Sequence, residues 1–377
     1  MTMSMALLGG CQKGEVQQTS QEPSLQSDVV NIVETSEELS QEVPTEIISE
    51  QYKVLANTID EYLNQEKFNG VALVASGEKL ILVKGYGLSN VEQKEKMTID
   101  KKFQIASVSK SFVAVSILQL VEAGKLSLTQ TIDQFFPTLP HGEEITIHQL
   151  LTHTSALYSG DDLTNYTELT TIDEIIADAF KENNLYYEEP GVYAIYSNLG
   201  YDLLGVIIEQ ITGQTYAEYV KTHIFDPLEM TNSGLNMEGL SLENMATAYN
   251  GNISEGYLAR VLHPSFGYAS GGLHSTAMDL YKYDRALATN QLISKESYDL
   301  MTTAYSKIGN KDYGYGWYID IWLDNTVSHA GNLIGWHSML LRDQDDQMTV
   351  ILLTNHDESD MNMAYNIGRL VLSTVNE

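Results

Sequence analysis

The chain has 377 residues, a hydrophobic content of 43% and a formal net charge of −30 at neutral pH. These values describe a globular protein, and the scarcity of Lys and Arg argues against nucleic-acid binding, which needs clustered basic side chains. The longest apolar runs are the length of a strand, far short of the roughly 20 residues that a membrane-spanning helix requires.

The N-terminal segment contains the only cysteine of the chain, Cys11, which excludes an intrachain disulfide and a cysteine-based metal site. The letters ALLGGC over residues 6–11 look like the end of a bacterial lipoprotein signal, in which the cysteine is acylated after cleavage. Residues 1–5 depart from that pattern because they contain no Lys or Arg, and the apolar stretch is short. Two interpretations stay open: an outward-facing, extracytoplasmic lipoprotein anchored to the membrane through Cys11, or an unused thiol on a loose tail.

Residues 12–50 are rich in Gln, Ser, Thr and Glu, with Lys13 as their only base and no aromatic residue. Such a segment cannot bury enough apolar surface to offset its chain entropy. We therefore expect a disordered acidic tether, which suits a lipid anchor and equally suits a low-complexity spacer. A folded domain is expected over residues 51–377.

The folded part begins with helical periodicity near residues 54–63, followed by two β-rich runs, GVALVA and KLILVKGYG, joined as a hairpin at Ser76–Lys79. An apolar helix follows Ser107, and helical patterns continue through the middle of the chain. Strands return in YGYGWYIDIWL, TVSHAG, HSMLLRD and MTVILLT, and an apolar helix, AYNIGRLVLSTV, ends the chain.

Strands at both ends of the chain predict an α+β fold. We expect a mostly antiparallel sheet built from both chain ends and flanked by helices, with a helical subdomain inserted. The α/β part should comprise about residues 51–115 and 265–377, and the helical part about residues 116–264.

An S-x-x-K pattern, Ser107 to Lys110, lies at the start of the apolar helix, where residues three apart share a face. Ser107 has two interpretations: an N-cap of the helix, or a nucleophile beside an amine and backbone N–H groups that can polarise an oxyanion. A neutral Lys110 can take the proton of Ser107 if burial disfavours its charged form. Ser76–Lys79 fits the same pattern, but a hairpin turn provides no common buried face.

Two further short motifs follow in the chain. Tyr196-Ser-Asn198 lies between a Pro-Gly bend and an apolar helix, and His329-Ala-Gly331 ends a predicted strand. Gly331 permits a ligand to approach the backbone of an edge strand closely. Three motifs in order, each in a suitable local structure, are more specific than any one of them.

With these motifs, residues 55–375 resemble the serine β-lactamase and penicillin-binding protein superfamily, on its class C β-lactamase and DD-peptidase-like side. The stretches LLTHTSAL, YSNLGYDLLG and ASGGLHSTAMDL are also similar to stretches typical of that family. The resemblance implies a β-lactamase/transpeptidase-like fold and an exported serine hydrolase that works through an acyl-enzyme.

The resemblance also implies a role for each motif residue. Ser107 would be the acylated nucleophile, Lys110 its base or proton shuttle, and Tyr196 the side chain that exchanges a proton with Ser107 and the leaving group. Asn198 would hydrogen-bond the substrate amide and Lys110. His329 would line the strand against which the substrate docks.

The same resemblance places the oxyanion hole at the backbone N–H groups of Ser107 and Asn332, and substrate contacts at Ala330, Gly331 and Asn332. Ala330 departs from the family pattern, because relatives that process D-Ala-D-Ala ends or β-lactams usually carry Thr or Ser there. The missing hydroxyl could weaken recognition of a free carboxylate by about 1.5–3 kcal/mol. This favours an esterase, D-amino-acid amidase or peptidase over a β-lactamase.

The leading expectation is a cofactor-free hydrolase of cell-envelope peptides or esters, of the D-Ala carboxypeptidase, D-amino-acid peptidase or esterase type. A catalytically idle cell-wall-binding or sensor protein of the same fold, and a class C-like β-lactamase, are the alternatives. β-Lactams are candidate acylating agents, and contact with a membrane is expected only through a lipid on Cys11. The histidines show no H-E-x-x-H spacing, so no metal site is expected.

Two groups of aromatic residues are interpreted as structural. His153 in LLTHTSAL follows a helix and is expected to pack rather than react. The cluster of Tyr313, Tyr315, Trp317 and Tyr318 alternates with the period of a strand, so most of it is expected to pack in the sheet. One or two of its members are expected to face the substrate.

Overall fold

The computed structural model describes residues 46–157, 171–179, 189–237, 242–260, 263 and 266–375. The chain divides into two units, Met1–Glu42 and Val43–Glu377, and every described residue belongs to the second. Cys11 and most of the expected tether therefore lie outside the described residues. None of the helices that the structure describes is long and apolar enough to cross a membrane.

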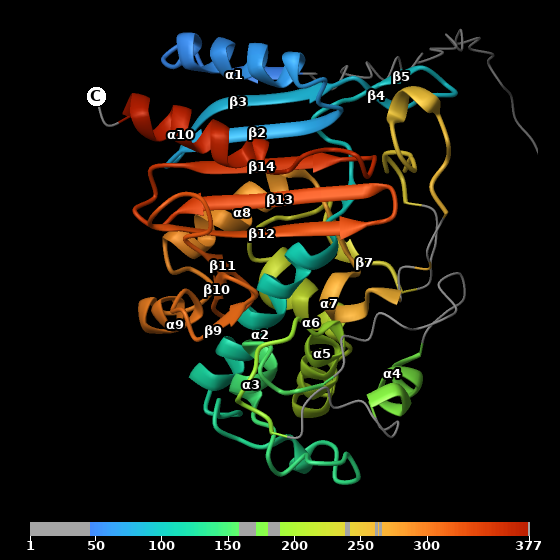
Figure 1. Ribbon diagram of the computed structural model, residues 1–377, viewed down its shortest axis with the longest axis vertical. Coiled ribbons are helices and arrows are strands. Elements are labelled where there is room, and N and C mark those ends of the chain that lie inside the picture. The colour runs from blue at the N-terminus through green and yellow to red at the C-terminus, as the bar shows by residue number, and fades with distance from the viewer. Residues whose placement is uncertain are drawn as a thin grey trace, which may run out of the picture. The chain divides into compact units, whose positions relative to one another are not determined.

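A sheet of nine described strands forms the centre of the second unit, in the order β1-β3-β2-β14-β13-β12-β11-β10-β9 (Figure 1). All of its neighbouring strands pair antiparallel. Its strands are β1 (Glu46–Ile48), β2 (Gly70–Ser76), β3 (Lys79–Tyr86), β9 (Ser306–Ile308), β10 (Lys311–Tyr313), β11 (Tyr318–Ile319), β12 (Thr326–Leu333), β13 (Trp336–Asp343) and β14 (Thr349–Thr354). Because β14 pairs with β2, the prediction of an antiparallel sheet built from both chain ends is confirmed.

Smaller sheets and helices complete the fold. The short strands are β4 (Leu88–Asn90), β5 (Glu95–Lys96), β6 (Phe103–Gln104), β7 (Gly234–Leu235) and β8 (Leu273–Ser275). The α-helices are α1 (Lys53–Gln65), α2 (Ser109–Glu122), α3 (Ile147–Leu151), α4 (Ile172–Ala179), α5 (Asn198–Thr212), α6 (Tyr216–Val220), α7 (Tyr268–Gly271), α8 (Ala277–Ala288), α9 (Lys295–Met301) and α10 (Met363–Val375). The 3₁₀ turns are Ala106–Val108, Ile132–Gln134 and Ile253–Glu255, and a π-helical turn, Lys221–Phe225, continues α6.

The central sheet is buried on both faces, which explains why its inner strands are almost continuously apolar. Successive side chains of a strand point to opposite faces. Val71 and Leu73 of β2 belong to the hydrophobic cluster that contains α2. Ala72 and Val74 belong to the cluster that contains α1 and α10, the two helices that lie along β2, β3 and β14 in Figure 1.

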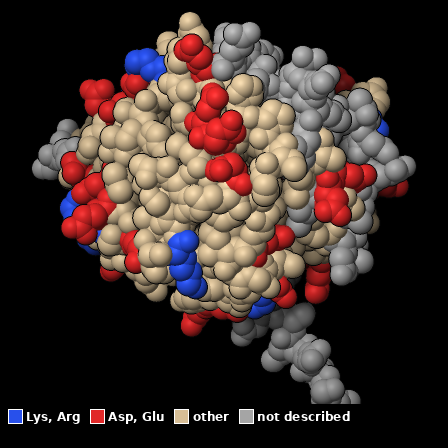
Figure 2. All heavy atoms as spheres, turned by 90° about the horizontal axis from the view of Figure 1, so that it is seen from below, with Lys and Arg blue, Asp and Glu red and all other residues tan. Residues whose placement is uncertain are grey.

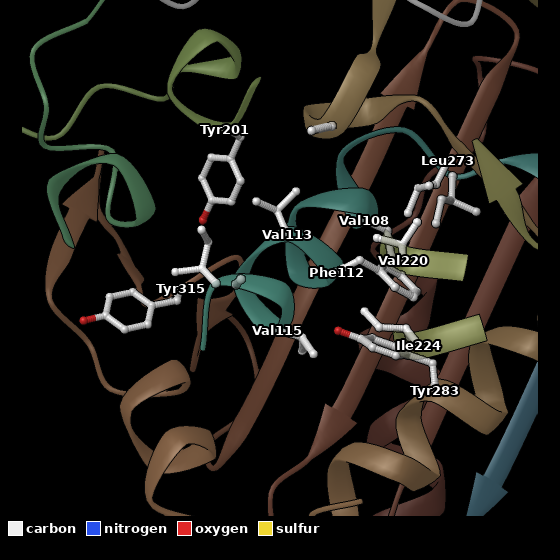
Figure 3. Close-up of a cluster of buried hydrophobic side chains, with 14 of the residues drawn as sticks. Val108, Phe112, Val113, Val115, Tyr201, Val220, Ile224, Leu273, Tyr283 and Tyr315 are labelled. Carbon is white, nitrogen blue, oxygen red and sulfur yellow. The ribbon is translucent and has the colours of Figure 1, made fainter. Parts of the chain in front are cut away.

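Helix α2 is buried around most of its circumference, which fixes the start of the helix in space. Phe112 stacks on Tyr283 of α8, with ring centroids 3.9 Å apart. Figure 3 shows Phe112, Val113 and Val115 leaving α2 in different directions to meet neighbouring helices and strands. The residues that begin α2 are therefore held by packing on several sides.

Three boundaries differ from those expected from the sequence. Residues 46–48, expected in the tether, form the edge strand β1 paired with β3. The expected boundary between residues 115 and 116 falls inside α2, so the two parts share this helix. The long strand expected in YGYGWYIDIWL is limited to the end of β10 and the two residues of β11, because the chain bends between them at Gly316, whose φ is 75°.

Candidate active site

Ser107 and Lys110 lie together at the entrance to α2. Ser107 is in the 3₁₀ turn that precedes the helix, and no side-chain hydrogen bond caps α2. The fully buried Lys110 places its Nζ 3.1 Å from Ser107 Oγ. The N-cap interpretation of Ser107 therefore fails, and the hydroxyl is paired with an amine instead.

Two further acceptors hold the Lys110 amine in place. Its Nζ donates to Asn198 Oδ1 at 2.7 Å and to the carbonyl oxygen of Ser270 at 2.9 Å. The buried carboxylate of Asp202 supports this arrangement by accepting a hydrogen bond from the Ser270 N–H at 2.9 Å. Burial raises the pKa of Asp202, although the charge of Lys110 and the Ser270 hydrogen bond oppose that shift.

The second motif lies at the N-terminus of α5. Ser197 is the N-cap, since its Oγ accepts from the Gly200 N–H at 3.1 Å, and Asn198 is the first residue of the helix. Tyr196, directly before the cap, has its ring centroid 4.7 Å from Lys110 Nζ. This local fold brings Tyr196 and Asn198 to the same lysine.

His153 lies behind this motif and supports it, as the structural interpretation expects. Its Nδ1 accepts a hydrogen bond from the Ser197 N–H at 3.0 Å, and its ring centroid lies 4.4 Å from that of Tyr196. Burial, followed by the charge of Lys110, lowers the pKa of His153 well below its usual value, and a protonated His329 would lower it further. A neutral imidazole that accepts at Nδ1 can position Tyr196 and Ser197.

His329 is a neutral part of the cavity wall. Its Nδ1–H donates to the Ala330 carbonyl at 2.7 Å, and its Nε2 accepts from the Tyr313 hydroxyl at 3.2 Å. Burial and the nearby charge of Lys110 lower its pKa to about 3. His329 therefore cannot supply the positive charge that a lysine at this position would supply.

Among the described strands, β12 has an edge near Ser107 that is only partly paired, and the unpaired part is called its open edge. β11 pairs with β12 only at Val327 and Ser328, while β13 pairs with β12 along its whole length. Gly331 packs against the turn that carries Ser107, because a Cβ there would lie 2.2 Å from the Ile105 carbonyl oxygen. The glycine thus permits close packing of β12 against that turn, and the substrate contact expected at Gly331 stays a prediction.

A cavity of about 420 Å³ brings the three motifs together. The expected site residues in its wall are Ser107, Tyr196, Asn198, His329, Ala330 and Asn332. Both residues expected to form the oxyanion hole thus face one space. Lys110 lies beneath it and reaches it through Ser107.

The cavity also has walls that the sequence motifs do not indicate. They comprise Lys311, Tyr318, Ile321, Trp322, Ser328, Met339, Asn362 and Tyr365. Of the aromatic cluster, Tyr318 lines the cavity while Tyr313, Tyr315 and Trp317 are buried, in agreement with the alternation in the sequence. Trp322 and Asn362 lie between regular elements, where no periodic pattern indicates them. Within the described part of the chain, no cluster of His, Cys, Asp or Glu could hold a metal ion.

A serine hydroxyl paired with a buried amine, beside an open strand edge and a cavity, defines a serine hydrolase of the acyl-transfer type. The pattern that defines the family described as Beta-lactamase matches residues 55–373, and the chain belongs to that family.

Similar proteins support this assignment. Penicillin-binding protein 4* of Bacillus subtilis (strain 168) is 32% identical over 325 residues, which cover 80% of this chain and 71% of that protein. A putative penicillin-binding protein, PbpX, of the same organism is 29% identical over 336 residues, which cover 89% of this chain and 83% of that protein.

Solved structures give the same fold. The octameric penicillin-binding protein homologue from Pyrococcus abyssi has a TM-score of 0.75 at 30% identity, covering 85% of this chain and 77% of that chain. D-amino acid amidase from Ochrobactrum anthropi SV3, complexed with D-phenylalanine, has a TM-score of 0.75 at 24% identity, covering 87% of this chain and 99% of that chain. The predicted family and fold are confirmed.

Proposed function

We propose that this serine hydrolase is exported and cleaves cell-envelope peptides or esters through an acyl-enzyme on Ser107. The observation that carries the proposal is the 3.1 Å contact between Ser107 Oγ and the buried Lys110 Nζ at the floor of the cavity. The open edge of β12 beside it suits a substrate that docks as an extended strand. The names of the Bacillus subtilis relatives support a substrate of the cell envelope.

The proposed reaction has two steps. Ser107 Oγ attacks the substrate carbonyl carbon while Lys110 takes its proton, and the N–H groups of Ser107 and Asn332 stabilise the oxyanion. The bond to the leaving group then breaks, and Tyr196 passes a proton to that group while Lys110 returns to Tyr196 the proton that it took from Ser107. Water attacks the acyl-enzyme in the second step, which releases the acid and restores the Ser107 hydroxyl.

Two alternatives predict different outcomes. A class C-like β-lactamase would turn over a chromogenic cephalosporin, which the absence of a hydroxyl at Ala330 disfavours. A cell-wall-binding or sensor protein of the same fold would turn over nothing, although the intact contacts among Ser107, Lys110 and Asn198 favour catalysis.

The test is a panel of p-nitrophenyl acetate, D-alanyl-p-nitroanilide, a D-Ala-D-Ala peptide and nitrocefin, with wild type and Ser107→Ala. We expect hydrolysis of at least one ester or peptide that depends on Ser107. Mass spectrometry after a fluorophosphonate or penicillin should show an adduct on Ser107. Turnover that survives the substitution would contradict the mechanism, and no turnover of any substrate would favour the binding alternative.

The anchoring of the enzyme is a separate part of the proposal. Cys11 follows the letters ALLGG, which suit acylation of its thiol, and the Gln-, Ser- and Glu-rich residues after it suit a spacer between membrane and enzyme. Fractionation of cells should find the wild type with membranes and Cys11→Ala in the soluble fraction. A soluble wild-type protein would refute the anchor.

A further inference from the structure

The described walls of the cavity carry no acidic residue. None of the described residues that line it is Asp or Glu, although the chain contains 51 acidic residues against 21 Lys and Arg. Figure 2 shows the acidic excess on one outer face, where red side chains outnumber blue ones. The cavity therefore differs in charge from the rest of the molecule.

Lys311, the first residue of β10, is the one basic residue in the described walls besides the neutral His329. Its Nζ lies 5.8 Å from the ring centroid of Tyr318, and that ring lies 5.4 Å from the ring of His329. The neighbouring carboxylate of Asp312 is already paired with Lys307 at 2.7 Å. Among the described residues, Lys311 has no ion-pair partner of its own.

The other groups near the nucleophile cannot balance a negative charge on a substrate. Lys110 is fully buried and donates to Asn198 and Ser270. His329 Nε2 accepts a hydrogen bond from the Tyr313 hydroxyl, and the imidazole is neutral. Ala330 has no hydroxyl, so in the described walls a carboxylate finds an accessible cation only at Lys311.

An apolar surface adjoins Lys311 in the same cavity. Tyr318, Ile321 and Trp322 follow β10 in the chain and line the cavity with Met339 and Tyr365. Trp322 leaves 54% of its surface exposed, although Trp is usually well buried. This surface can take up the apolar part of a substrate whose charged end lies at Lys311.

We propose that Lys311, with Tyr318 and Trp322, forms a subsite for an anionic group, so that the enzyme prefers substrates with a carboxylate and disfavours those with a free ammonium near the scissile bond. The preference follows because a carboxylate gains a counter-ion in the cavity, whereas an ammonium finds Lys311 and no acid. The inference rests on the proposed function, since it concerns the substrate of the same nucleophile.

Three p-nitrophenyl esters of equal chain length test the preference: those of pentanoic acid, glutaric acid and 5-aminopentanoic acid. For wild type we expect kcat/KM to fall in the order glutarate, pentanoate, aminopentanoate. Lys311→Gln should lower the glutarate-to-pentanoate ratio by about threefold to fivefold, as for a partly exposed ion pair. Lys311→Glu should favour the aminopentanoate over the glutarate, and added salt should weaken the wild-type preference.

Lys307→Gln is the matched control, since Lys307 is a nearby surface lysine paired with Asp312 and does not line the cavity. It should leave the ratio of the two esters unchanged. One outcome is that wild type hydrolyses the esters through Ser107 while Lys311→Gln leaves the glutarate-to-pentanoate ratio unchanged. In that case the proposed subsite is wrong and the proposed function stands. If no ester is hydrolysed in a Ser107-dependent way, both are wrong.

Discussion

Lys110 has the surroundings of a lysine that works as a base. In its charged form Lys110 can donate to Ser107 Oγ, Asn198 Oδ1 and the Ser270 carbonyl oxygen. A neutral amine, formed when one proton is lost, has two N–H groups and one lone pair. Asn198 Oδ1 and the Ser270 carbonyl oxygen can accept the two N–H groups, which leaves the lone pair directed to Ser107. The contacts of this one side chain thus explain why the site needs residues from the start of α2, from α5 and from α7.

The first prediction concerns this lysine. Lys110→Met should lower kcat/KM on p-nitrophenyl acetate by roughly a hundredfold to ten-thousandfold, the range for loss of a general base. Lys79→Met is the matched control, since Lys79 belongs to the other S-x-x-K pattern and is the first residue of β3, directly after the turn that follows β2. Circular dichroism and Lys110→Arg separate loss of catalysis from loss of folding. An active Lys110→Met enzyme would contradict the assignment of the base.

The second prediction concerns the position that departs from the family pattern. Ala330→Thr should raise the rate of acylation by penicillin by roughly tenfold, because its hydroxyl can hydrogen-bond a carboxylate in the cavity. Ala330→Val has nearly the same shape without the hydroxyl and is the control. Stopped-flow measurement of acylation compares the two variants with wild type. Equal rates for the Thr and Val variants would show that a hydroxyl there contributes nothing.

At the scale of elements, the sequence predicted those helices and strands that are determined by local periodicity and by turn residues. The hairpin of β2 and β3, the apolar helix after Ser107 and the strands β12 to β14 follow from periodicity and turn residues. Lys311 and Trp322 could not be predicted as cavity residues, because their position depends on how β10 and the segment after β11 meet β12. The strand β1 was missed because its polar surroundings resemble a tether and its partner β3 is distant in sequence.

The third prediction concerns the contact between β12 and the turn that carries Ser107. Gly331→Ala would place a Cβ 2.2 Å from the Ile105 carbonyl oxygen and 2.3 Å from Ser338 Oγ, so the strand must move. We expect a loss of about 1–3 kcal/mol in unfolding free energy and a loss of activity, since the oxyanion hole spans this contact. Urea unfolding and ester hydrolysis measure both.

Gly368→Ala in α10 is the control for that substitution. A Cβ there would meet only the ends of flexible side chains, at 3.2 Å or more. Alanine is also favoured over glycine inside a helix. We expect a smaller change in stability and unchanged hydrolysis. A Gly331→Ala enzyme as stable and as active as Gly368→Ala would show that β12 can shift without effect.

Over the whole molecule, buried titratable groups link folding to pH. Burial lowers the pKa of His153, brings that of His274 to about 4, and, with Lys110, brings that of His329 to about 3. An unfolded histidine binds a proton below about pH 6.5, whereas these folded ones do not, so acidification favours unfolding. Asp202 acts in the opposite direction, because burial raises its pKa and its folded form binds a proton first.

The fourth prediction tests this linkage at His329. Its contribution to stability should be complete above about pH 6.5 and decline as the pH falls toward about 3, by about 1.4 kcal/mol per pH unit. His329→Gln can still accept from Tyr313 but cannot titrate, so its unfolding free energy should fall less steeply between pH 6.5 and pH 4. Urea unfolding at several pH values gives both slopes, with His141→Gln on the surface as the control. Equal slopes for wild type and His329→Gln would mean that this histidine binds its proton as readily in the folded as in the unfolded protein. That result would contradict the assignment of His329 as a neutral residue of the cavity wall.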